Sequence, residues 1–97
     1  MNYKIENNQL FVCDNNGFKL KLICDKANYT SYNEKEKIFL VTLLNGNVVT
    51  RDTNGNAIRL ICENAIEARF VDDKIQVRRK DGRNELRDKY GNQIKWL

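Results

Sequence analysis

The sequence predicts an all-β fold made of about three imperfect repeats of roughly 37 residues, each with up to four short antiparallel strands. Three observations lead to this prediction. A turn-and-strand motif occurs three times, short apolar segments alternate with turns rich in Asn, Asp and Gly, and no long stretch has helical periodicity. The absence of proline is compatible with hydrogen-bonded strands along the whole chain.

The repeat is clearest when residues 14–27 are aligned with residues 52–65. Both segments begin with Asp-x-Asn-Gly and continue into an apolar run that ends in Leu-Ile-Cys. A shorter third copy, residues 88–97, keeps the Asp-x-x-Gly turn and the Ile that follows it. This pattern favours an Asx-type turn with Gly at positive φ, followed by a half-buried strand. The apolar positions expected to share one strand face are Leu20, Leu22 and Cys24; Ile58, Leu60 and Cys62; and Ile94 and Trp96.

The repeated Asp is interpreted as a turn residue and not as a cation ligand, because a calcium loop needs several more oxygen ligands at fixed spacing. The unit is faintly similar to bacterial WG-type β-repeats. The Trp-Gly pair of that family is absent, however, and Asp-x-x-Gly turns occur in many unrelated β-proteins, so we assign no family.

The first unit, residues 1–34, contains four β-prone segments separated by polar turns. The predicted strands are residues 3–6, 9–13, 18–24 and 28–32. The polar segment Asn33–Lys37 that follows is expected to be a solvated loop.

The second unit, residues 35–71, begins with the most apolar run of the chain, Ile38–Leu44. This run is too short for a helix and is followed by an Asn-Gly turn, so we predict a strand covered on both faces. Further strands are expected over residues 48–51, 57–62 and 66–70. The last of these alternates apolar and charged residues regularly.

The third unit, residues 72–97, contains predicted strands over residues 75–80, 84–87 and 93–97 and stops where a fourth strand would begin. The expected total is about eleven strands. An unpaired edge favours aggregation, so we expect Met1–Glu6 to pair with the C-terminal strand, or a neighbouring subunit to supply a partner.

Residues 1–97 are expected to form one domain. Three arrangements with pseudo-threefold symmetry remain open: a small barrel, a trefoil-like fold, and a propeller-like assembly. Propellers usually need at least four blades, so the last arrangement requires several chains.

Composition excludes most catalytic chemistry. The chain has no His, no phosphate-binding glycine loop and no dinucleotide-binding motif, so we predict that it is not an enzyme and binds no cofactor or metal. The adjacent pair Asp72-Asp73 is interpreted as a solvated turn. No apolar run approaches 18 residues, which predicts no membrane span. Of three cysteines, Cys24 and Cys62 align and are expected to be small buried hydrophobes, which favours a reducing, cytoplasmic location.

Charge is concentrated in the last quarter of the chain. Residues 74–97 carry eight basic and three acidic side chains, a net charge of +5, within a chain of net charge +4. Alternation places Lys74, Gln76, Arg78 and Lys80 on one face of a strand. The candidate binding residues are Lys74, Arg78, Arg79, Lys80, Arg83, Arg87, Lys89 and Trp96.

These features support two functional hypotheses. The first is a non-catalytic interaction or structural module that binds a protein partner, or a second copy of itself, through its β-sheet surface or edge. The second is a small nucleic-acid-binding β-domain in which the C-terminal basic stripe contacts phosphates. A solvated edge protected by Lys and Arg explains the stripe without any ligand.

Overall fold

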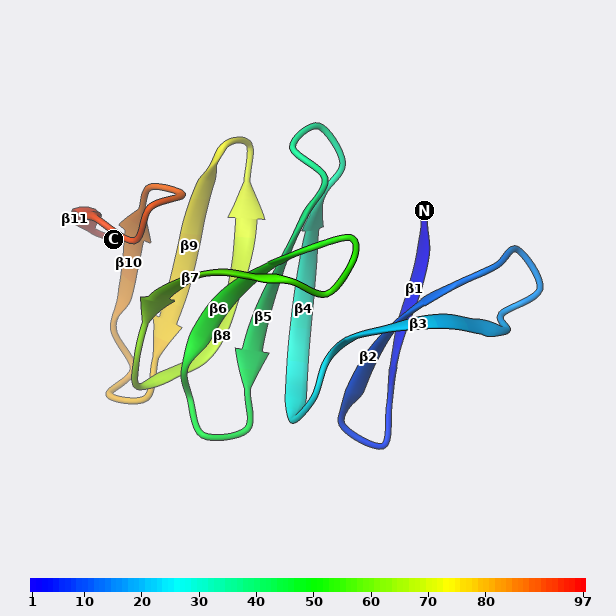
Figure 1. The fold of residues 1–97 in the computed structure, drawn as a ribbon. Helices are drawn as coiled ribbons and strands as arrows, with labels where there is room; N and C mark the ends of the chain where they lie inside the picture. Colours follow the sequence, from blue (N-terminus) through cyan, green and yellow to red (C-terminus); the bar gives the residue numbers. More distant parts are fainter.

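The computed structural model describes all residues from Met1 to Leu97 and is entirely β-structure (Figure 1). Eleven strands confirm the predicted all-β class. Their bounds are β1 (Asn2–Glu6), β2 (Gln9–Cys13), β3 (Lys19–Cys24), β4 (Ala27–Asn33), β5 (Ile38–Leu43), β6 (Val48–Asp52), β7 (Ala57–Cys62), β8 (Ala65–Val71), β9 (Lys74–Arg79), β10 (Asn84–Arg87) and β11 (Gln93–Trp96).

The strands form three antiparallel sheets that follow one another along the molecule (Figure 1). Their strand orders are β1-β2-β3, β4-β5-β6-β7 and β8-β9-β10-β11, so each strand pairs only with its neighbours in sequence. No sheet closes on itself, and the structure therefore contains no closed barrel. The expected pairing of Met1–Glu6 with the C-terminal strand is wrong, because β1 pairs only with β2 and β11 only with β10.

The three Asp-x-x-Gly turns have the same backbone hydrogen bonds, which confirms their interpretation as turns. In the second turn the Asp52 N–H donates to the Asn56 carbonyl (3.0 Å) and the Gly55 N–H donates to the Asp52 carbonyl (3.1 Å). The Asp52 Oδ1 also accepts two backbone N–H groups. Asp14 and Asp88 do the same in the first and third turns, and all three glycines have positive φ.

The strands after these turns contain bulges that the sequence pattern does not reveal. Where β7 pairs with β6, neither Ile58 nor Ile61 has a partner across the ladder. A bulge interrupts the alternation of side chains. Ile61 and Cys62 are consequently both buried, whereas Ile58 and Leu60 are exposed, so the expected common face with Cys62 is wrong. The same departure occurs in β3, where Leu20 and Leu22 are exposed.

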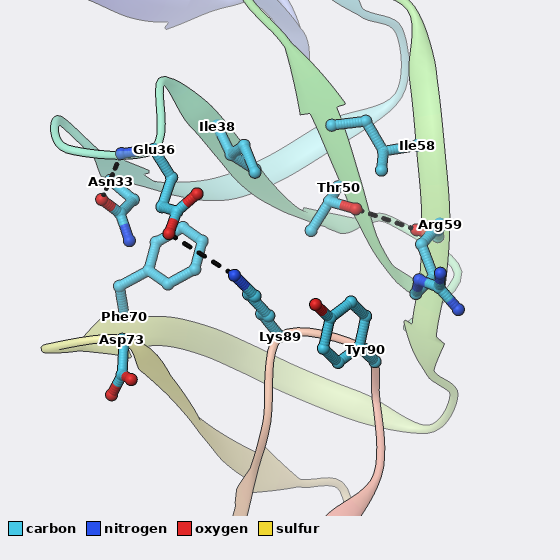
Figure 2. Close-up of a pocket in the computed structure, with 10 residues that line it drawn as sticks. All are labelled: Asn33, Glu36, Ile38, Thr50, Ile58, Arg59, Phe70, Asp73, Lys89 and Tyr90. Carbon is cyan, nitrogen blue, oxygen red and sulfur yellow. Dashed lines mark hydrogen bonds and ion pairs between the residues drawn. The ribbon is translucent and has the colours of Figure 1, made fainter.

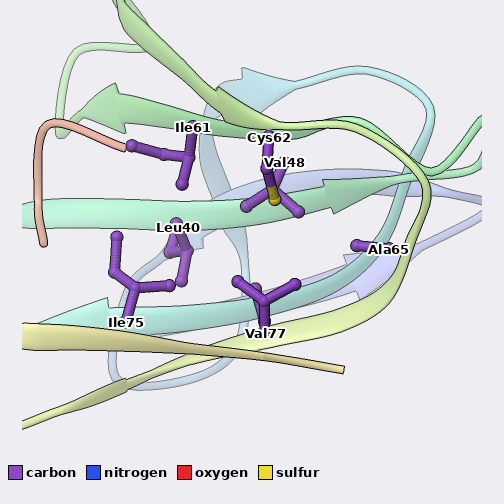
Figure 3. Packing of buried hydrophobic residues seen from close by; sticks show 8 residues of the cluster. Leu40, Val48, Ile61, Cys62, Ala65, Ile75 and Val77 are labelled. Carbon is purple, nitrogen blue, oxygen red and sulfur yellow. The ribbon is translucent and has the colours of Figure 1, made fainter. Parts of the chain in front are cut away.

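Two small cores lie between successive sheets. One packs β5, β6 and β7 of the second sheet against β8 and β9 of the third sheet (Figure 3). The other packs β2 and β3 against β4 and β5. Residues that align in the sequence repeat occupy equivalent places in the two cores. The pairs, with the residue of the first and second sheets' core given first, are Leu10/Val48, Ile23/Ile61, Cys24/Cys62, Ala27/Ala65, Phe39/Ile75 and Val41/Val77. The cysteines are thus small buried residues, as expected.

Strand β5 contributes to both cores. Leu40 packs in the cluster with the third sheet, while Phe39 and Val41 pack in the cluster with the first sheet. The prediction of a strand covered on both faces is confirmed. Thr42, also on β5, is buried and its Oγ1 accepts the backbone N–H of Ala68 on β8 (3.1 Å).

Successive sheets are joined by two-residue links with matching hydrogen bonds. In the first link, Lys26 has a positive φ angle. The backbone N–H of Ala27 donates to the Asn8 carbonyl (2.8 Å), and the backbone N–H of Leu44 donates to the Lys26 carbonyl (2.9 Å). In the second link Ala65 and Lys80 donate in the same way. The sheets therefore break at these links and not at the polar segment Asn33–Lys37, which joins β4 to β5 within one sheet.

Two of the three turn glycines also pack against the preceding sheet. A Cβ on Gly55 would lie 2.9 Å from the Leu22 carbonyl oxygen, and a Cβ on Gly91 would lie 2.8 Å from that of Ile61. Gly17, in the first turn, has open space around it.

Gly91→Ala should therefore destabilise the protein more than Gly17→Ala. Both substitutions place Ala at positive φ (+92° and +85°), which costs about 1–2 kcal/mol. Only Gly91→Ala also forces a methyl group against the Ile61 backbone, which adds about 1–3 kcal/mol of overpacking. Urea denaturation of the two variants measures the difference, and equal losses would show that the turn does not pack on β7 as described.

Candidate interaction surface

The eight predicted binding residues do not form one surface. Along β9, Ile75 and Val77 are buried, and Arg78 is exposed on the opposite face near Glu67, Arg69 and Asn84. The next residue, Arg79, points to the other side and is only 19% exposed. The basic side chains are thus divided between two faces of the third sheet.

Arg79 and Arg87 are held by a buried carboxylate. Glu85 on β10 is fully buried, and its Oε1 accepts the Arg79 guanidinium (3.3 Å) and the Nε of Arg87. Its Oε2 accepts the Gln93 side-chain amide (3.0 Å). Arg87 also donates to the Gly91 carbonyl. These two arginines therefore stabilise the third sheet and are not available to an external ligand.

Most of the other predicted cations lie beside an acceptor of the chain itself. Lys74 pairs with Asp73 (3.4 Å), Lys89 with Glu36 (3.5 Å), and the Lys80 ammonium donates to the Asn45 carbonyl (3.4 Å). Arg83 pairs with Asp81 and stacks over the exposed ring of Trp96, 4.2 Å from its centroid. Arg78 is the only one of the eight without an ion pair, hydrogen bond or stacking contact, so the positive field of the stripe is largely compensated locally.

A pocket of about 200 Å³ lies where the second and third sheets meet (Figure 2). Ile38, Ile58 and Phe70 form its apolar lining. The Arg59 guanidinium lies 5.3 Å from the centroid of the Tyr90 ring. The Lys89–Glu36 pair crosses one side, as Figure 2 shows. Pockets for drug-sized ligands usually measure 300–1,000 Å³, so this pocket suits a single inserted side chain better than a cofactor.

Each of β3, β7 and β11, the last strand of each sheet and an edge strand in each case, carries two apolar side chains that are at least 45% exposed. On each strand an apolar, a basic and a second apolar residue follow one another, and all of them are exposed. We call these segments the edge rows, and they are Leu20-Lys21-Leu22, Ile58-Arg59-Leu60 and Ile94-Lys95-Trp96.

Sequence reasoning found the repeat that contains the edge rows but assigned most of their residues to a half-buried strand. Only Trp96 was among the predicted binding residues. The signal that was available is the conserved order apolar–basic–apolar in all three copies, including the aligned cations Lys21, Arg59 and Lys95. An alternating pattern alone does not show which face is covered.

The titratable groups around the turns and cores have structural roles. Backbone hydrogen bonds from Asn56 and Asn92 hold the pKa values of Asp52 and Asp88 below their usual range, so both stay ionised at neutral pH. Burial raises the pKa values of the Cys24 and Cys62 thiols, which keeps them protonated and poorly nucleophilic.

Comparison with known proteins adds no assignment, because no protein-family model matches the chain and no curated protein sequence is significantly similar to it. The structure has no helix that is long and apolar enough to span a membrane.

Replacing Glu85 by Ala should destabilise the protein by about 3 kcal/mol, because it leaves two guanidinium groups without their buried acceptor. The second sheet carries Leu43 and Val49 at the aligned positions of Arg79 and Glu85. The double variant Arg79→Leu/Glu85→Val imitates that sheet, leaves only Arg87 without a carboxylate, and should lose less stability than Glu85→Ala. Guanidinium denaturation compares the two, and a double variant as unstable as Glu85→Ala would contradict the equivalence of the positions.

Proposed function

We propose that this chain is a non-catalytic interaction module that binds a protein partner through the exposed edge strands of its sheets. The observation that carries the proposal is the set of edge rows, in which pairs of apolar side chains remain exposed on β3, β7 and β11. Contiguous exposed apolar patches are a common feature of protein interaction sites, and edge strands also offer unpaired backbone groups. Three buried free cysteines suit a reducing compartment such as the cytoplasm.

A tandem arrangement of three related units is part of the proposal. The aligned core positions and the matching turns and links support it, because each unit would bury its apolar face only against its neighbour.

A second copy of the chain, stacked on the third sheet, is less favoured as the partner than a different protein. The second sheet uses Leu40 and Val48 to pack against the next sheet, whereas the aligned residues of the third sheet are Gln76 and Asn84. The outer face around them is lined entirely by polar side chains and glycine. Burying this face would remove several polar groups from water without apolar gain.

Nucleic-acid binding through the C-terminal stripe is the alternative function. Arg78 on the outer face and the Arg83–Trp96 stack are the features that favour it. The carboxylates beside Lys74, Arg79, Arg83, Arg87 and Lys89 weigh against it, because each phosphate contact would have to replace an existing ion pair.

The test combines light scattering with selection from a displayed library of random twelve-residue peptides. At about 150 mM salt we expect a constant mass with or without a mixed oligonucleotide pool, and selection of peptides that bind the folded chain. The proposal would be contradicted by a mass increase that oligonucleotides cause at low salt and that disappears at high salt. The double variant Arg78→Glu/Lys80→Glu would also have to lose this increase. Arg79 is left unchanged because Glu85 requires it.

A further inference from the structure

We propose that the three edge rows form one continuous docking surface for an extended polypeptide in which acidic and aliphatic residues alternate. The inference rests on the proposed function and names the chemistry of its partner. It is carried by the exposure of the rows, the charge at their centres and the contacts of the turns at Gly55 and Gly91 with the preceding strand.

The apolar residues of the rows are unusually exposed for strand residues. Leu22, Leu60 and Trp96 are 45%, 50% and 48% exposed, respectively, and Ile66 and Val71 on β8 are the strand aliphatics outside the rows with similar exposure. Each row therefore offers two apolar side chains to a ligand. Bulges at Leu20 and Ile58 keep the rows irregular, which hinders direct pairing of one edge with another copy's edge.

The central cation of each row has no carboxylate within ion-pair distance. Lys21, Arg59 and Lys95 are three of the nine basic residues without such a pair, and the other eight basic residues of the chain pair with Asp or Glu. Each row thus places a positive charge without an ion pair between two apolar side chains, with Asp52 near Lys21 and the Tyr90 ring beside Arg59. The complementary ligand carries a negative charge between apolar groups, three times along its length.

The rows are linked to one another through the turns. Gly55, three residues before Ile58, lies against the carbonyl of Leu22, and Gly91, three residues before Ile94, lies against that of Ile61. Lys21 is near the second turn, where it adds to the effect of the Asn56 backbone N–H in lowering the pKa of Asp52. Arg59 similarly lies over Tyr90 of the third turn.

This spacing suits an extended peptide. Three residues of chain span at most about 10 Å, so Ile58 and Ile94 lie within about that distance of the glycines that contact the preceding strand. Figure 1 shows β3 and β7 both crossing in front of the other strands, with β11 at the end of the series. A segment of about ten residues, up to roughly 33 Å long, therefore reaches all three rows within a molecule 40 Å long.

A peptide fits the rows better than an anionic membrane. β3, β7 and β11 are edge strands, so one side of each backbone has no strand partner, and only the turns at Gly55 and Gly91 lie against the backbones of β3 and β7. A peptide backbone satisfies such N–H and C=O groups while its side chains meet the row, which is how added strands combine affinity with specificity. Lipid headgroups can match the charge but not the backbone pattern.

The test is fluorescence anisotropy with a capped, dye-labelled ten-residue peptide of alternating Glu and Leu. The wild-type chain should bind it, and binding should weaken as salt rises. The row variant Lys21→Glu/Arg59→Glu/Lys95→Glu should bind at least about tenfold more weakly. The matched control Lys26→Glu/Lys35→Glu/Arg69→Glu changes the net charge equally at exposed cations outside the rows and should stay within about twofold of the wild type.

The apolar contribution is tested separately. Leu22→Ser/Leu60→Ser/Trp96→Ser should also weaken binding at least about tenfold, whereas Leu44→Ser/Ile66→Ser/Val71→Ser removes similarly exposed side chains elsewhere and should have little effect. Circular dichroism establishes that all four variants are folded.

Four outcomes overturn the inference, and the last of them leaves the proposed function standing. The first is the absence of binding to the Glu-Leu peptide by the wild-type chain. The second is equal loss in the row and control variants, which would indicate a net-charge effect only. The third is binding to phosphatidylserine vesicles that the row variant abolishes, together with no peptide binding, which would assign the rows to a membrane. Library peptides that bind the row variant normally would leave the proposed function standing and refute the rows as its site.

Discussion

Burial of β5 on both faces is the constraint on which the rest of the structure depends. Phe39 and Val41 pack toward the first sheet and Leu40 toward the third, so one strand of six residues belongs to both cores. A chain of 97 residues buries only a modest apolar core. Two small clusters that share a central strand solve this problem, because loss of either cluster exposes one face of the same strand.

The junctions between sheets show how the clusters are kept small and closed. Ala27 and Ala65 are fully buried immediately after the two-residue links, where each also donates its N–H to a turn of the preceding sheet. A larger side chain would separate the sheets. The polarity of aligned residues differs between the sheets, as Val49 and Glu85 show. The first is apolar, whereas the second is a buried carboxylate with two arginines. The backbone hydrogen bonds are therefore the same at both junctions, whereas the polarity of aligned positions differs.

Much of the fold could be predicted from the sequence, because its signals are local. Asp-x-x-Gly turns follow from Asx hydrogen bonding and the freedom of Gly, and the apolar run Ile38–Leu44 indicated a doubly covered strand. The association of sheets was not predictable, since alternation does not show which face is covered. The bulges at Ile58 and Ile61 reversed the expected face of β7, and the pairing of Arg79 with buried Glu85 removed it from the predicted basic stripe.

The edge rows are best understood from what an edge strand normally avoids. An exposed edge with apolar side chains favours aggregation, and proteins commonly protect edges with bulges and cations. Here both protections are present on β3 and β7, yet the apolar side chains remain exposed beside the cations. Protection alone would be met by polar residues at Leu22, Leu60 and Trp96. The apolar residues at the same place in three sheets belong to neither core, and the proposed contact with a peptide accounts for their exposure.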